Sequence, residues 1–126
     1  MKLLIDTHLL LWAAADTLPR EAVPYFADEN ELFFSSASIW EAVIKRGLNR
    51  PDFRLDPAAL YQGLLDNGYM EIPVASKHVL LVADLPSMHK DPFDRILIAQ
   101  ARAEGVALLS SDGIVAQYSP VIYVNG

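Results

Sequence analysis

The chain has 126 residues, of which 52% are hydrophobic, so its length and composition exclude a disordered chain and fit one domain with a buried core. It has no cysteine, which excludes disulfides and thiolate metal sites and fits a reducing cytoplasm, and no apolar run reaches the ~18 residues that a membrane helix needs. The net charge of −6 argues against binding of nucleic acid through basic side chains alone, because phosphate contacts dominate that affinity.

The first half of the chain is predicted to alternate strands with helices. A short apolar run ends at Asp6, and the helix that follows it is apolar on nearly every side, which indicates a buried or covered helix. Pro19 and Pro57 fit the first turns of two later helices, where a missing N–H costs little. The expected elements are a strand at 2–6, helices at 8–15 and 19–28, a strand at 31–35, a helix at 37–47, a polar connection at 49–56 and a helix at 56–67.

The second half continues the alternation. Asp91-Pro92 begins a helix that Gly105 ends, and a buried strand follows directly. The expected elements are strands at 70–72, 106–109 and 121–124, helices at 76–83 and 91–104, and a loop at 85–90. Because parallel neighbours need helical crossovers, this pattern predicts one α/β domain over residues 1–126, with a mainly parallel central sheet of about five strands flanked by helices.

Four acidic residues are expected at one edge of this sheet. Asp6 and Asp112 follow the first and fourth strands. Glu41 lies one turn into the helix that follows the second strand, and Asp94 one turn into the helix that precedes the fourth. Ligands of open parallel sheets bind beyond the carboxyl ends of the strands, which is where these four carboxylates fall.

Each acid also has a simpler interpretation as part of a helix terminus. Asp6 fits a cap of the helix at 8, Ser38 with Glu41 fits a capping box, and Asp112 fits a cap of the segment 113–117. Asp91 fits an N-cap, with Asp94 facing the helix dipole. Capping does not explain why one edge collects acids from four distant segments. Like charges raise one another's pKa unless a cation neutralises them, and hard cations such as Mg²⁺ choose oxygen ligands.

Three segments carry a resemblance to a known family. LLIDTHLLLWA, SSASIWEAVIK and HKDPFDRILIAQARAEGVALLSSD resemble the VapC-like branch of PIN-domain toxins, in the same order and at similar distances. The likeness covers essentially the whole chain and implies a single PIN domain over residues 1–126. It also implies a metal site at Asp6, Glu41, Asp94 and Asp112. Asp94 is preferred to Asp91 because the family's third acid precedes apolar residues and an Ala-x-Ala pattern.

Other residues in these segments have two interpretations each. Thr7, Ser35, Asp91 and Ser110 fit hydrogen bonds to the ligand carboxylates, or ordinary roles at strand and helix ends. Lys45 and Arg95 fit phosphate contacts, and Lys45 equally an ion pair with Glu41. The two tryptophans, Trp12 and Trp40, are expected in the core rather than as platforms for bases. The histidines His8 and His89 are expected as hydrogen-bonding or solvated side chains, because Mg²⁺ prefers oxygen.

The function that the resemblance implies is that of a Mg²⁺- or Mn²⁺-dependent endoribonuclease, the toxin of a type II toxin–antitoxin module. RNA would be its substrate, a small antitoxin its partner, and a homodimer its assembly. Two alternatives are a catalytically silent PIN-like binding module and a phosphoryl-transfer domain of the haloacid-dehalogenase or receiver kind. The dehalogenase pattern needs a second acid two residues after the first, where this chain has His8.

Overall fold

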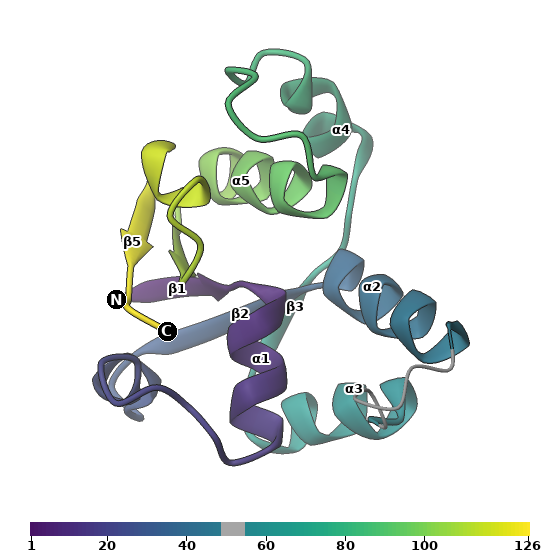
Figure 1. Cartoon of the computed structure of the whole chain (residues 1–126), viewed down its shortest axis with the longest axis vertical. Coiled ribbons are helices and arrows are strands. Elements are labelled where there is room, and N and C mark those ends of the chain that lie inside the picture. Colours follow the sequence, from purple (N-terminus) through teal and green to yellow (C-terminus); the bar gives the residue numbers. More distant parts are fainter. Residues whose placement is uncertain (49–54) are drawn as a thin grey trace.

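The central sheet is parallel throughout, as Figure 1 shows for a computed structural model that describes residues 1–48 and 55–126. Most of the connection predicted at 49–56 lies outside these residues. Within them, five strands follow the order β3-β2-β1-β4-β5. The strands are β1 (Lys2–Ile5), β2 (Glu31–Ser35), β3 (Met70–Ile72), β4 (Ala107–Ser110) and β5 (Val121–Tyr123). Since every neighbouring pair is parallel, the carboxyl ends of β1, β2 and β4 meet at one edge.

Helices cover both faces of the sheet. In Figure 1, α1 and α3 lie on one side, α4 and α5 lie on the other, and α2 extends from the carboxyl end of β2. The helices of the described ranges are α1 (Thr7–Ala14), α2 (Ser36–Gly47), α3 (Pro57–Asp66), α4 (Ser76–Val82) and α5 (Pro92–Glu104), with short 3₁₀ turns at Val23–Phe26 and Val115–Gln117. None of these helices is both long and apolar enough to span a bilayer.

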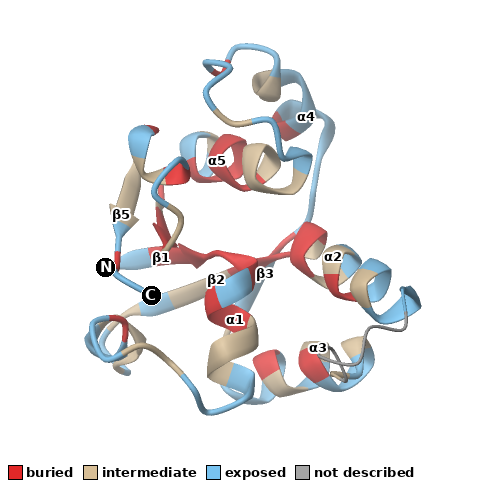
Figure 2. Cartoon of the chain, viewed as in Figure 1, coloured by how far each residue is buried: buried red, intermediate tan, exposed pale blue. Residues whose placement is uncertain are grey.

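Alternating side chains divide the core into two halves. Leu3 and Ile5 of β1 pack with Leu9 of α1 on one face, whereas Leu4 packs with Leu97 of α5 on the other. Figure 2 shows the buried residues concentrated in the sheet and on the inner sides of the helices. A strand that is buried on both faces explains why the sequence of β1 is a continuous apolar run.

Local sequence signals predicted several helix ends correctly. Asp56 and Asp91 are N-caps followed by proline, and Gly105 adopts the left-handed conformation with φ 68° at the end of α5. These findings confirm the predicted α/β class and the order of its elements.

The helix predicted at 19–28 is wrong. Only the 3₁₀ turn Val23–Phe26 forms there, and Pro24 stands inside it. Proline lacks the N–H that a helix interior needs and disfavours helical geometry at the preceding residue, so a proline suited to the first turn at position 19 was not sufficient to predict a helix here.

Candidate functional site

Asp6 lies where β1 ends and α1 begins. Its Oδ1 accepts a hydrogen bond from the backbone N–H of Leu9 at 2.9 Å, and its Oδ2 accepts one from the N–H of Ser111 at 3.4 Å. The carboxyl is buried, and this burial raises its pKa although the hydrogen bonds, including one from the Ser110 side chain, act in the opposite direction. Asp6 therefore caps a helix and also contacts the segment that follows β4.

Asp112 belongs to that segment. Its Oδ1 accepts hydrogen bonds from the N–H groups of Ile114 and Val115, at 2.7 and 3.1 Å, which confirms a capping role. The Ser110 hydroxyl accepts a bond from the N–H of Asp112 at 3.1 Å and also bonds Asp6. Ser110 thus connects two of the predicted ligands. The second carboxylate oxygen of Asp112 does not take part in these capping bonds.

Asp94 lies in the first turn of α5 and contacts a histidine. Its Oδ2 is 2.6 Å from Nε2 of His89, and the same nitrogen is 4.0 Å from Oδ2 of Asp112. The pKa of Asp94 is raised to about 6, chiefly by burial and to a smaller extent by the negative charges of Asp91 and Glu41, against the opposing effect of His89. The carboxylate of Asp94 is therefore partly buried and has other acidic residues near it.

Glu41 is held by an ion pair on its own helix. Lys45 Nζ lies 3.6 Å from Glu41 Oε2, which is the predicted pairing of residues four apart. The capping-box alternative is wrong, because Ser35 rather than Ser38 is the N-cap of α2. Glu41 is consequently free of any capping role, and its charge acts on Asp94.

The tightest group of possible ligand atoms contains His89, Asp94 and Asp112. One possible ligand atom from each lies within 4.8 Å of the others. Among residues 1–48 and 55–126, these are the histidine and acidic residues that form a group of at least three by this distance. Asp6 is joined to it through Ser110 and Ser111, and Glu41 through its electrostatic effect. Oxygen and imidazole donors suit a divalent cation, which would also offset the cost of keeping the partly buried carboxylate of Asp94 ionised beside other acids. The residues present therefore fit a divalent metal ion.

Three other predicted residues have clear structural contacts. Asp91 caps α5 by accepting from the N–H groups of Phe93 and Asp94. Thr7 bonds the Ser38 hydroxyl at 2.8 Å, and Ser35 accepts from the N–H of Ala37 at 3.0 Å. The bonds of Thr7 and Ser35 thus go to a hydroxyl and a backbone amide instead of the expected carboxylates, and they fix how α1 and α2 leave the sheet.

Arg95 holds the loop between α4 and α5. Its two terminal nitrogens donate at 2.8 to 3.3 Å to four carbonyl oxygens, those of Val82, Leu85, Pro86 and His89. The four hydrogens of these nitrogens are thereby matched, so the guanidinium organises this loop.

Tyr118 completes the same arrangement. Its hydroxyl donates to the carbonyl of Pro86 at 2.6 Å and accepts from the N–H of His89 at 2.9 Å. The sequence prediction missed Tyr118 and the closeness of His89 to the acids. The available signal was the position of His89 five residues before Asp94, at the entry to α5.

The two tryptophans, Trp12 and Trp40, differ in how far they are buried. Trp12 packs partly buried against the core as predicted. Trp40 is 62% exposed and makes an edge contact with Phe93 at 5.1 Å between ring centroids, so its predicted place in the core is wrong. It lines an apolar groove of about 760 Å³ between α2, α4 and α5, together with Ile44, Val74 and Val79.

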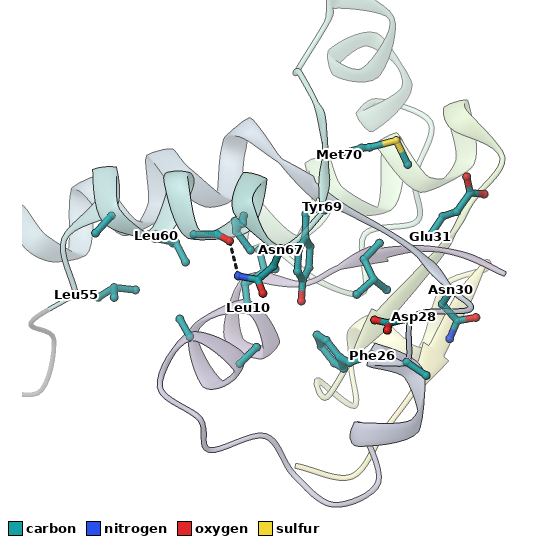
Figure 3. Close-up of a pocket in the computed structure, with 18 residues that line it drawn as sticks. Leu10, Phe26, Asp28, Asn30, Glu31, Leu55, Leu60, Asn67, Tyr69 and Met70 are labelled. Atoms are coloured by element: carbon teal, nitrogen blue, oxygen red, sulfur yellow. Dashed lines mark hydrogen bonds between the residues drawn. The ribbon is translucent and has the colours of Figure 1, made fainter.

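A second hollow lies away from the acids. Figure 3 shows this cavity of about 680 Å³ between α1, α3 and the segment before β2, with Leu10, Phe26, Leu60 and Tyr69 around it. Burial raises the pKa of Tyr69 to about 12. Asp28 and Glu31 add acidic groups to the lining. The cavity is therefore apolar in its walls and acidic in part.

Comparison with known proteins gives one family and several similar structures. The PIN domain model matches residues 3–119, whereas no curated protein sequence matches. A chain of the VapBC2 structure from Rickettsia felis, bound to a promoter DNA fragment, is 15% identical, with 98% of each chain covered and a TM-score of 0.71. A chain of DNA-bound VapBC from Salmonella typhimurium is 13% identical, with 99% of this chain and 97% of that chain covered and a TM-score of 0.70. A chain of a toxin–antitoxin complex from Klebsiella pneumoniae is 18% identical, with 94% of each covered and a TM-score of 0.64. These likenesses show a shared fold.

Proposed function

The chain belongs to the PIN domain family, and on this premise we propose that it is a metal-dependent endoribonuclease, the toxin of a VapC-type toxin–antitoxin module. The observation that carries the proposal is the approach of Asp94 and Asp112 from two distant segments, with His89 between them, within 4.8 Å. Membership of the PIN domain family excludes the alternative of a dehalogenase or receiver domain. The silent binding module remains the alternative that an activity measurement must exclude.

The acids would share the work of holding Mg²⁺ or Mn²⁺. Asp94 and Asp112 would contribute carboxylate oxygens, and Asp6 and Glu41 would complete the negative charge around them. A bound divalent cation would supply the positive charge that offsets the charge growing on a phosphodiester during hydrolysis. It would also reverse the local sign in a protein of net charge −6, so that RNA can approach.

The protein's own groups would orient the reactants. Asp6 is fixed by two backbone N–H groups and Asp112 by two others, so these carboxylates cannot turn freely. Lys45 lies beside Glu41 and would contact a substrate phosphate. Single-stranded RNA would suit such a site because its backbone is accessible, and cellular RNA would make the cytoplasm the place of action.

The direct test is cleavage of mixed RNA by the purified protein with Mg²⁺ or Mn²⁺. We expect Asp6→Asn to lose cleavage while retaining the circular dichroism spectrum of the fold. Asp66→Asn changes an exposed acid on α3 and is the matched control. Cleavage that persists in Asp6→Asn would reject the assigned site, and a wild-type protein that binds metal but cleaves no RNA would favour the binding module.

The proposed antitoxin fits the cavity of Figure 3. Its walls of leucine and phenylalanine would receive the apolar face of a helix, and Asp28 and Glu31 would favour a partner with basic side chains. The similar structures include complexes described as toxin–antitoxin, which supports such a partner. We expect Ala14→Glu, inside the cavity, to abolish co-purification with the proposed antitoxin. Ala58→Glu lies on α3 outside the lining and should leave the complex intact.

A homodimer would use the apolar groove beside Trp40. Exposed apolar side chains of α2 and α4 meet there with Val74, and such a patch is typical of an interface.

A further inference from the structure

We propose that His89 is a ligand of the metal ion through Nε2, and that this nitrogen makes the site prefer Mn²⁺ to Mg²⁺. The inference rests on the proposed function of the same site. It changes the expected donor set from oxygen alone to oxygen and nitrogen.

The position of the imidazole carries the proposal. Nε2 is hydrogen-bonded to Oδ2 of Asp94 at 2.6 Å and lies 4.0 Å from Oδ2 of Asp112, so a cation bound here would take the place of the proton that His89 and Asp94 share. The ring nitrogen therefore faces the same space as the carboxylate oxygens that would bind a cation. His89 is also part of the group whose donor atoms lie within 4.8 Å of one another.

The loop that carries His89 is held in place by the rest of the protein. The backbone N–H of His89 donates to the Tyr118 hydroxyl, and its carbonyl accepts from Arg95. Arg95 follows Asp94 directly, so the residue next to one ligand fixes the main chain of another. A ligand needs such support because its position must be set before the metal arrives.

The other two histidines of the chain have different surroundings. His78 is buried, with Nδ1 accepting from the N–H of Ala75 and Nε2 bonded to Glu104, so both nitrogens serve the fold. His8 is exposed and stacks on Trp12. The structure thus distinguishes His89 as the histidine whose ring nitrogen faces two carboxylates.

The chemistry of the donors predicts the selectivity. Mg²⁺ binds oxygen and gives up its water reluctantly, whereas imidazole suits the transition metals. Replacing one oxygen by a nitrogen should therefore favour Mn²⁺. Two carboxylates remain in the group, so we expect Mg²⁺ to bind more weakly than it would to a site of oxygen ligands alone, but still to bind.

Pulsed electron paramagnetic resonance of the Mn²⁺-loaded wild-type protein tests coordination without any activity measurement. We expect a ¹⁴N coupling typical of a bound imidazole, lost in His89→Gln and retained in His8→Gln. Glutamine keeps an N–H that can bond Asp94, so a merely supporting role would survive this substitution. Absence of the nitrogen coupling in the wild-type protein would overturn the proposal and would leave the nuclease function standing.

Calorimetric titration with Mn²⁺ and with Mg²⁺ tests the selectivity. We expect His89→Gln to weaken Mn²⁺ binding about tenfold or more, on the scale of changes near metal sites, and Mg²⁺ binding much less. Equal weakening of both ions would contradict nitrogen ligation. A wild-type protein that binds neither ion would instead refute the proposed function itself.

Discussion

The backbone N–H of Ser111 donates a hydrogen bond to Oδ2 of Asp6 over 3.4 Å, although 105 positions separate the two residues. The contact exists because β1 and β4 are parallel neighbours, with Ile5 beside Leu109 at their last shared register position. The candidate site is therefore a product of the sheet topology, and changes in its supporting contacts should have measurable effects.

The first prediction concerns pH. Burial and neighbouring acids raise the pKa of Asp94 from 3.8 to about 6, so the metal-free folded protein binds a proton more tightly than the unfolded chain does. Its free energy of unfolding should therefore fall as pH rises from about 4 to about 6, by at most about 3 kcal/mol from this group. Urea unfolding with a chelator present measures this. Asp94→Asn should flatten the pH dependence, and an unchanged slope would contradict the assignment, with Asp66→Asn as the control.

The second prediction separates two roles of Arg95. Arg95→Lys leaves some of four carbonyl oxygens without a donor, so we expect a loss on the order of 2 kcal/mol in the free energy of unfolding. Denaturant unfolding checks the value. A phosphate contact would behave differently, since the lysine variant would keep its stability and change only the KM for RNA.

The third prediction concerns the bridge between Asp6 and Asp112. Ser110→Ala removes a buried hydroxyl that bonds both segments, which should lower the free energy of unfolding by about 1–2 kcal/mol. It should also weaken Mn²⁺ binding in calorimetry, because Asp6 loses a supporting bond. Ser111→Ala retains the backbone N–H that reaches Asp6 and serves as the control. Equal effects of the two substitutions would argue against a special role for Ser110.

The fourth prediction concerns assembly. Trp40→Glu places a charge in the apolar groove between α2, α4 and α5, and we expect it to convert a dimer to a monomer. Sedimentation equilibrium measures the change, and the exposed position means that the fold should tolerate it. Glu29→Gln, an exposed substitution outside the lining of the groove, should leave the dimer unchanged. A dimer that survives Trp40→Glu would place the interface elsewhere.

Much of the fold was predictable because its signals are local. The apolar run before Asp6, the Asp-Pro pairs at helix starts and Gly105 at a helix end each act within a few residues. The order of the strands then brings the acids to one edge. The error at 19–28 shows the limit of this approach, because Pro19 fits the first turn of a helix whereas Pro24 is incompatible with its interior.

The parts of the site that the sequence did not predict depend on contacts between distant residues. His89 approaches Asp94 and Asp112 because Arg95 and Tyr118 hold its loop, and Tyr118 lies 29 positions from His89. The exposure of Trp40 likewise depends on how α2, α4 and α5 leave a groove between them. Neither of these arrangements produces a periodic pattern of residues in the sequence from which it could be predicted.

The place of β4 beside β1 has a consequence for protein synthesis. This strand and the Asp112 that follows it are translated after every other segment that contributes to the acidic group, yet β4 occupies an interior position in the sheet. A nascent chain still attached to the ribosome at α5 thus lacks one wall of the site. The proposed metal site can therefore assemble only after β4 and Asp112 have emerged from the ribosome.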